Sequence, residues 1–310
     1  LVTLLLVVCP SKRTSRNRSW LWGGFVVVVV LLWLMDQHRL QPWAVHLVLG
    51  AVVFSSCQPR RGLMMLRMLA ISIYVYSAAG KFDYQFMHSV GPQFLHALFA
   101  LIGVDSARWD PASMAKWSLM FPVAELGVGL LLCHRKTRHV GVVGAWIMHV
   151  SLIVVLSPMG LDHQWGVVVW NVLFLLQALW LFWGDVPGDA GVQTEKQSGW
   201  IGWLGQGVVT AAMVLPLLEP TGLYDHWPSW GLYSPRNSRV IVRVDLLADE
   251  EMDALEEFFQ PQFGNTAFRV LDLSRWSLET LGVPIYPQQR FQLGVALAVG
   301  EKYALGRSLE

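Results

Sequence analysis

Six or seven apolar segments of membrane-spanning length, separated by short loops, constrain this chain more than any other feature. A helix needs about 20 apolar residues to cross a hydrocarbon core about 30 Å thick, and the first two segments are at or below that length. Lipid offers the backbone no hydrogen-bond partners, so spanning segments must close their bonds within helices. The sequence therefore predicts an all-α polytopic membrane helical bundle. The expected spans are 20–35, 42–57, 63–80, 117–133, 140–158, 166–184 and 200–218.

The composition also favours a membrane protein. Apolar residues make up 54% of the chain and charged residues only 15%, whereas an ordinary soluble domain has about 25% charged residues. The Trp residues fall largely at the ends of the apolar segments, where amphipathic rings favour the headgroup level. A soluble all-α protein would need helices with a polar face, which these segments lack. We therefore expect the lipid bilayer as a partner and the cell (inner) membrane as the location.

Lys and Arg are frequent in every second loop and sparse in the loops between. The positive-inside rule assigns the basic loops to the cytoplasm. With seven spans, residues from about 219 onward then lie outside the cytoplasm. The basic residues assigned to the cytoplasmic side are Lys12, Arg13, Arg16, Arg18, Arg60, Arg61, Arg67, Arg135, Lys136, Arg138 and Lys196.

Composition divides the chain into four parts. Residues 1–62 hold a basic segment and two spans, 63–184 the next four spans, 185–218 a polar linker and the last span, and 219–310 a tail. Residues 1–9 are apolar but too short to span, and they fit either the end of a helix or an interfacial segment. The tail mixes strand and helix patterns, which predicts a small α/β extracytoplasmic domain. Its expected strands are 239–246 and 268–273, its expected helices are 248–260 and 274–281, and 291–299 fits either.

Several classes of function find no support in the residue pattern. Cys9, Cys57 and Cys133 map to the cytoplasmic ends of segments and form no Cys-x-x-Cys pair, so a dithiol enzyme is not expected. No Cys/His cluster has the spacing of a metal site, so we expect no metal. The tail has mixed charge and no basic run, which argues against nucleic acid as a partner.

Two ionisable residues lie deep within consecutive predicted spans, where polar groups are costly. Glu125 is roughly 12 Å and His149 roughly 14 Å below the outer ends of their spans, at 1.5 Å per residue. Antiparallel helices would bring them to matching depth, where they could share a proton or hydrogen-bond a quinone oxygen. Alternatively, they satisfy each other and only fix the helix packing. Asn171, in the next span, fits either a lining residue of the same cavity or an interhelical hydrogen bond.

Two motifs follow each other in the central part of the chain. The first is a small-residue helix end, Tyr76-Ser-Ala-Ala-Gly-Lys81-Phe, and the second is a helix with Pro122-Val-Ala-Glu125-Leu, followed by a basic turn and another helix. Over about residues 63–184 this order resembles the DoxX/MauE superfamily of four-helix membrane proteins. The resemblance implies a subunit that supports a quinone-linked or thiol-linked redox process, through a cavity around Glu125 and His149 with quinone as the candidate cofactor. Because the outer parts hold no cysteine, a thiol-linked role would need a thioredoxin-like partner.

The segment that ends in Lys81 also resembles the HTTM domain of vitamin K-dependent carboxylase-like proteins. That resemblance implies a membrane enzyme in which Lys81 is a base, since a partly desolvated Lys gives up its proton readily. Alternatively, Lys81 extends toward the headgroups, as a Lys at the end of a span normally does. A small-molecule transporter, which would require inverted repeats, and a structural membrane subunit remain further alternatives. The sequence leaves open whether the protein is an enzyme.

Overall fold

The computed structural model describes residues 15–106, 108–184, 199–233, 240–245, 250–261, 268–303 and 305. This part of the chain is mostly helical, and five of its helices are long and apolar enough to cross a membrane. The prediction of a helical bundle is therefore confirmed. The five are α4 (Pro59–Lys81), the continuous pair α6 (Pro111–Ser118) and α7 (Met120–Cys133), α8 (Arg138–Leu156), α9 (Trp165–Phe182), and α10 (Trp200–Val214) with its 3₁₀ extension η4 (Leu215–Thr221).

Two further apolar helices, α2 (Ser15–Met35) and α3 (Pro42–Ser56), correspond to the first two expected spans. A short 3₁₀ turn, η2 (Gln37–Arg39), joins them. Their apolar stretches, Ser19–Met35 and Pro42–Ser56, are shorter than the other five. Five described helices, rather than six or seven, thus have the length of a full span, because the first two apolar runs are at the lower limit for crossing.

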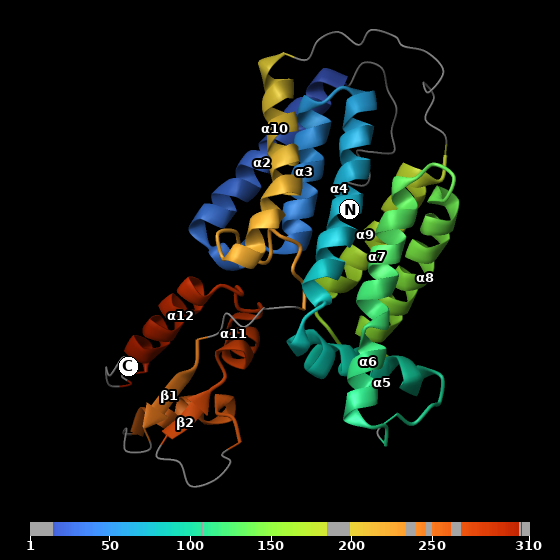
Figure 1. Ribbon diagram of the computed structural model, residues 1–310. Helices are drawn as coiled ribbons and strands as arrows, with labels where there is room; N and C mark the ends of the chain where they lie inside the picture. The colour runs from blue at the N-terminus through green and yellow to red at the C-terminus, as the bar shows by residue number, and fades with distance from the viewer. Residues whose placement is uncertain are drawn as a thin grey trace.

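Four helices pack in chain order, with α4 on α7, α7 on α8, and α8 on α9, and α9 also contacts α4. On the other side of α4 lie α2, α3 and α10, and α10 packs directly on both α3 and α4 (Figure 1). The last span is therefore an integral part of the bundle. The polar linker that precedes it falls outside the described residues.

A small helical lobe covers the end of the bundle where α4 ends and α7 begins. It consists of the π-helical turn η3 (Phe86–Val90), α5 (Gly91–Leu101) and α6 (Figure 1). Gly91 packs so closely on α6 that a Cβ in its place would lie 2.5 Å from the Cβ of Ser118. Only glycine permits this approach, which holds the lobe compactly between α4 and α7.

The C-terminal tail forms a separate small core. Strands β1 (Val242–Asp245) and β2 (Phe268–Leu271) pair antiparallel, with Val242 opposite Leu271. The 3₁₀ helix η5 (Glu250–Phe258), α11 (Leu273–Leu281) and α12 (Gln289–Lys302) complete the tail. The expected mixture of strands and helices in the tail is confirmed, and the segment 291–299 is helical. The tail core contains Val244, Leu255, Phe258, Phe259, Leu271, Leu273, Trp276, Ile285 and Val299.

The C-terminal core contacts the segment that follows η4 and the loop between α2 and α3 at a few specific points. The Tyr286 hydroxyl donates to Asp225 Oδ2 at 2.8 Å, and Arg290 pairs with the same carboxylate. Burial, with the hydrogen bond to Asp225, raises the pKa of Tyr286, so the phenol stays protonated and remains a donor. The edge of the His38 ring meets Phe291 with 4.7 Å between centroids.

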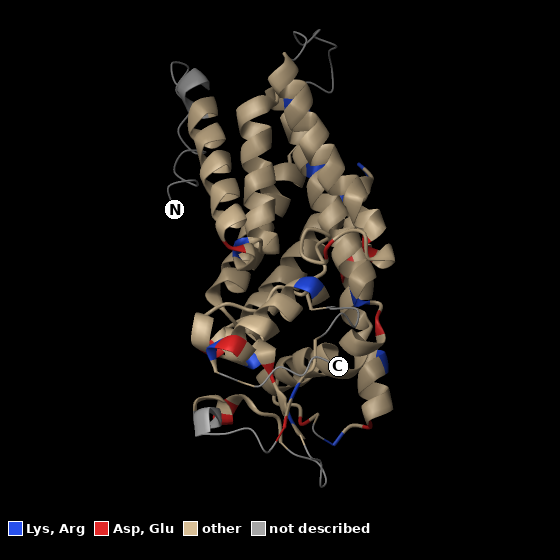
Figure 2. Cartoon of the chain, turned by 90° about the vertical axis from the view of Figure 1, so that its left-hand side faces the viewer, with Lys and Arg blue, Asp and Glu red and all other residues tan. Residues whose placement is uncertain are grey.

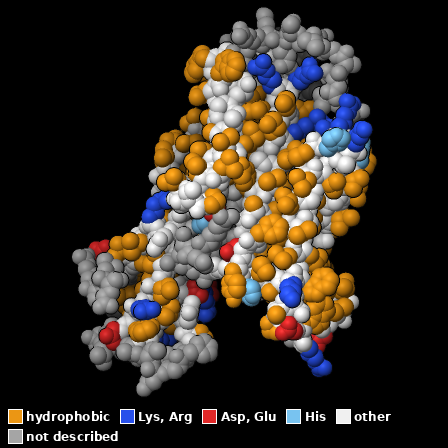
Figure 3. All heavy atoms as spheres, in the orientation of Figure 1, with side chains coloured by type: hydrophobic (Ala, Val, Ile, Leu, Met, Phe, Trp, Pro, Cys, Tyr) orange, Lys and Arg blue, Asp and Glu red, His pale blue; other side chains and the backbone are white. Residues whose placement is uncertain are grey.

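Charge is distributed unevenly along the bundle axis. Figure 2 shows no Asp or Glu at the end of the bundle far from the tail, among the residues it colours. Figure 3 shows Lys and Arg side chains at that far end, and a flank between the two ends covered largely by hydrophobic side chains. Leu130 of α7 and Val143 and Ile147 of α8 are among the exposed apolar side chains. Such a surface is typical of helices that face lipid.

Candidate functional site

One face of α4 carries three buried polar residues in the half of the helix that ends at Lys81. Tyr74, Ser77 and Lys81 are spaced three and four residues apart, which places them on the same side of a helix. All three are buried. Ser77 accepts a hydrogen bond from Lys81 of the same helix, whereas Tyr74 has its partner on α8 and Lys81 has its second partner on α7. The face of α4 turned toward the bundle therefore holds a continuous polar strip.

Lys81 ends this strip and makes an ion pair with Glu125 on α7. The ammonium Nζ donates to Glu125 Oε2 at 2.6 Å and to Ser77 Oγ at 2.6 Å. The exposed fractions of the two charged side chains are 11% and 15%. The alternative that Lys81 extends toward the headgroups is wrong, because the carboxylate of Glu125 and the hydroxyl of Ser77 hold the ammonium inside the bundle.

His149 belongs to a second, uncharged chain of hydrogen bonds. Its Nε2 lies 2.8 Å from the Tyr74 hydroxyl, and its Nδ1 lies 2.8 Å from Asn171 Oδ1. The Asn171 amide nitrogen donates to the carbonyl of Val167 at 2.9 Å, which fixes the amide orientation. An amide oxygen only accepts, so the neutral ring with hydrogen on Nδ1 satisfies both bonds. Tyr74 then donates to Nε2.

The predicted Glu125–His149 pair is not formed, since among the described residues no hydrogen bond joins them. α4 packs on α7 and brings a full positive charge to Glu125, and a carboxylate prefers an ammonium to a neutral ring. The prediction thus named four members of the site but assigned the wrong partner to Glu125.

Aromatic rings enclose the neutral chain. Phe174 stacks on the His149 ring with 5.2 Å between centroids, and it also contacts Tyr74 at 5.5 Å. His46 of α3 lies on the other side of Phe174 at 5.0 Å and accepts a hydrogen bond from Trp170 Nε1 at 3.1 Å. The sequence analysis missed Tyr74 and His46. The spacing of Tyr74, Ser77 and Lys81 was the signal that could have identified Tyr74.

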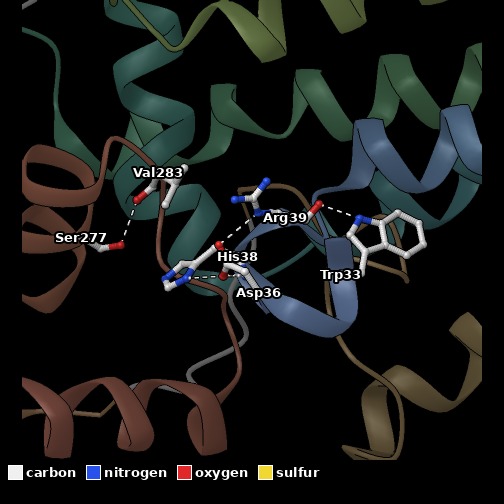
Figure 4. Close-up of polar contacts among 6 residues, drawn as sticks. All are labelled: Trp33, Asp36, His38, Arg39, Ser277 and Val283. Carbon is white, nitrogen blue, oxygen red and sulfur yellow. Dashed lines mark hydrogen bonds and ion pairs between the residues drawn. The ribbon is translucent and has the colours of Figure 1, made fainter. Parts of the chain in front are cut away.

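A second polar group that sequence reasoning missed lies in the loop between α2 and α3 (Figure 4). Asp36 accepts from the backbone N–H of His38 at 3.0 Å, and its carboxylate also lies 3.1 Å from His38 Nδ1. Partial burial opposes ionisation, but the hydrogen bonds from His38 and Arg39 outweigh it and lower the pKa of Asp36. Trp33 Nε1 donates to the Arg39 carbonyl at 2.8 Å. These bonds shape the loop between α2 and α3, which contacts the tail through His38. Within the tail, Ser277 Oγ donates to the Val283 carbonyl.

Comparisons with protein-family models, curated proteins and solved structures found no match to this chain. In the part of the chain that the structure describes, no group of three or more His, Cys, Asp or Glu side chains could hold a metal ion. The candidate site is therefore defined by its own geometry. It consists of a buried ion pair at the end of α4 and a neutral hydrogen-bonded chain beside it.

Proposed function

We propose that this multi-pass membrane protein exchanges protons with a membrane-soluble quinone and thereby supports a quinone-linked redox process. The observation that carries the proposal is the ion pair between Lys81 and Glu125, held at 2.6 Å within a bundle of apolar helices. Ionisable groups at membrane depth are costly, and they are retained mainly where a pathway or a proton relay needs them.

The chemistry of the pair suits proton exchange. A carboxylate and an ammonium that share a hydrogen bond can take up or release a proton while they stay in place. Glu125 keeps a small exposed fraction, 15% of its side chain, which gives a ligand access to the pair. A quinone that a separate electron-donating redox partner reduces must take up protons at its oxygen atoms. In the ion pair the transferable proton is on the Lys81 ammonium, so we assign proton delivery to Lys81, and to Glu125 the role of the carboxylate that holds the ammonium and accepts the replacing proton.

The neutral chain has a positioning role in this proposal. His149 and Asn171 hold the Tyr74 hydroxyl in one orientation, and Phe174 fixes the plane of the His149 ring. Tyr74 lies two helical turns from Lys81 on the same face of α4. In this proposal the quinone binds beside Glu125, and His149 and Asn171 act indirectly, through the Tyr74 hydroxyl that they orient.

A second candidate function is an HTTM-like membrane enzyme that uses Lys81 as a base. The observation that favours it is the double hydrogen bond of the ammonium to Ser77 and Glu125, which orients Nζ. A thiol-linked role has less support. Cys133 lies at the other end of α7 from Glu125, so the thiols would have to come from a thioredoxin-like partner.

The decisive experiment measures quinone bound to the purified full-length chain. Lipid-soluble molecules are extracted from the protein and quantified for the wild type, Glu125→Gln and Lys81→Met. Lys116→Met is the matched control, since Lys116 is an exposed Lys on α6. We expect quinone in the wild type and the control, and about tenfold less in the two site variants, because each loses a charge-assisted hydrogen bond. A wild type without quinone, or equal quinone in all folded variants, contradicts the proposal.

The proposed location is the cell (inner) membrane with the tail outside the cytoplasm. Its support is the alternation of basic loops in the sequence. The tail lies at one end of the bundle (Figure 1), and the alternation assigns that end to the outside of the cytoplasm. A periplasm-active reporter fused after Asp245 should be active, and the same reporter fused after Lys136 should be silent. The reverse pattern would overturn the orientation and leave the site chemistry untouched.

A further inference from the structure

A small cavity lies on a different face of α4 from the ion pair. It has a volume of about 170 Å³. Tyr76, Ala79 and Gly80 of α4 form one wall, and η4 forms another through Pro216 and Pro220. Ser77 and Lys81 point to the bundle side of the same two turns. This cavity is therefore separate from the candidate proton-transfer site.

One end of the cavity is polar. Glu219 lines it, and its carboxylate lies 2.6 Å from Nδ1 of the buried His226. Ser229 also lines it, with 5% of the residue exposed. Among the described residues, Ser229 Oγ has no hydrogen-bond partner. A buried hydroxyl without a partner is costly, so this atom indicates a group that the cavity takes up.

The turn that carries Ser229 is held in an unusual conformation. Trp230 is completely buried and has a φ of +64°, and Tyr233 has a φ of +62°. Non-glycine residues adopt this left-handed region at a cost, and such residues concentrate at ligand sites. Gly231 lies so close to the His226 carbonyl that a Cβ at position 231 would be 3.0 Å from the carbonyl oxygen. The packing thus fixes the direction of Ser229.

The oxygen atoms at the polar end match one kind of ligand. Tyr76 donates its hydroxyl hydrogen to the Met213 carbonyl at 2.8 Å, so its oxygen is left as an acceptor. Ser229 Oγ and the Glu219 carboxylate are further acceptors, and a carboxylate accepts several hydrogen bonds. A primary ammonium has three N–H donors and no acceptor. We propose that this cavity binds a primary ammonium group, with Glu219 as its counter-ion and the prolines around its carbon atoms.

The position of the cavity allows two sources of that group. It lies where α10 passes into η4, at the end of the bundle that carries the tail (Figure 1). Lipid headgroups lie at this level when the bundle spans a membrane, so the ammonium can belong to an ethanolamine phospholipid. It can also belong to a free small amine from the aqueous side. The chemistry of recognition is the same in both cases.

The test compares two amino alcohols, one whose ammonium carries three N–H donors and one whose ammonium carries none. Binding of ethanolamine and of choline to the full-length protein in detergent is measured by calorimetry. Choline carries a similar charge but has three methyl groups in place of the donors. We expect ethanolamine to bind and choline to bind at least about tenfold more weakly, because the charge-assisted hydrogen bonds are lost. Equal binding of the two, or no binding of ethanolamine to folded protein, overturns the proposal for the free amine.

The lipid arm uses native mass spectrometry with phosphatidylethanolamine and phosphatidylcholine of identical acyl chains. Selective retention of phosphatidylethanolamine assigns the cavity to a lipid headgroup, and binding of ethanolamine alone assigns it to a free amine. If neither arm prefers the primary amine, the inference is wrong.

Two variants locate the binding. Ala79→Leu fills the cavity from its rim and Ser229→Ala removes the unpartnered hydroxyl, while Ala112→Leu on the exposed surface of α6 is the matched control. We expect Ala79→Leu to weaken binding about tenfold or more, Ser229→Ala to weaken it less, and the control to leave it unchanged. Binding that survives Ala79→Leu and Ser229→Ala in folded protein places the amine elsewhere and overturns the inference.

Discussion

The bundle and the tail each contain ion pairs, in very different surroundings. In the bundle, Lys81 and Glu125 have exposed side-chain fractions of 11% and 15%, and their distance is 2.6 Å. In the tail, Arg275 and Glu279 are one helical turn apart on α11 at 2.7 Å, with exposed fractions of 49% and 44%. Water and salt screen the tail pair, whereas apolar helices surround the bundle pair. Similar distances therefore correspond to very different energetic consequences when one partner is removed.

The neutral hydrogen-bonded chain around His149 differs from both ion pairs. It is as deeply buried as the ion pair, but it carries no net charge and its members satisfy one another. Loss of one member leaves uncharged groups without partners, which costs less than an isolated charge. Stability should therefore fall most for the buried pair, less for the neutral chain and least for the tail pair.

The largest effect is expected for Glu125→Leu. The substitution leaves the Lys81 ammonium without its counter-ion inside the bundle, which should cost about 3–5 kcal/mol of unfolding free energy. Denaturant titration of the detergent-solubilised protein measures it. The double variant Lys81→Met/Glu125→Leu should regain much of the loss, since no unpaired charge remains. Equal instability of the single and double variants would show that the charge is not the cause.

His149→Leu should have the next largest effect. It leaves the Tyr74 hydroxyl and the Asn171 carbonyl oxygen without their partner, at a cost of about 1–3 kcal/mol. The same titration checks this value. Asn171→Leu serves as the comparison, because it removes the bond to Nδ1 and keeps the bond between Tyr74 and Nε2. A loss for His149→Leu as large as that for Glu125→Leu would argue against the distinction between charged and neutral chains.

Lys81→Arg separates charge from proton transfer. The guanidinium keeps the positive charge beside Glu125, so the stability should fall by only about 1–2 kcal/mol through altered packing. Guanidinium does not lose its proton near neutral pH, so turnover in a quinone-linked or base-catalysed assay should be lost. Full activity of the folded variant would assign Lys81 a purely structural role.

The smallest effect is expected for Glu279→Gln in the tail. Its partner Arg275 is well exposed, and an exposed pair within one helix contributes little. The unfolding midpoint should not shift measurably, at low or at high salt. A clear salt-dependent shift would show that the tail pair is coupled to the rest of the molecule, and the contrast with the bundle would then need revision.

Hydropathy was sufficient to locate the helices, because the pattern that it measures is local. The boundaries of α7, α8 and α9 lie within three residues of the expected spans. α4 begins four residues earlier than expected, and α10 ends four residues earlier, where η4 continues it. The tail was harder to predict. Phe291–Val299 alternates in the manner of a strand, yet it lies in α12, where Gln292 and Val299 are buried against the tail. For such a short segment, the tertiary contacts outweigh local preference.

The sequence alone determined which residues lie deep in the bundle, because the rise of a helix converts position in the chain into depth. Glu125, His149 and Asn171 were identified in this way, whereas Lys81, at the end of its span, was identified through the motif Tyr76-Ser-Ala-Ala-Gly-Lys81. Depth does not specify the direction in which a side chain points around its helix axis, nor which neighbouring helix it meets. The packing of α4 on α7 decided that Glu125 meets Lys81. The packing of α8 on α7 and α9 placed His149 where it meets Tyr74 of α4. Only the tertiary structure could decide this, because helices far apart in the chain supply the partners and the strongest available charge pairing prevails.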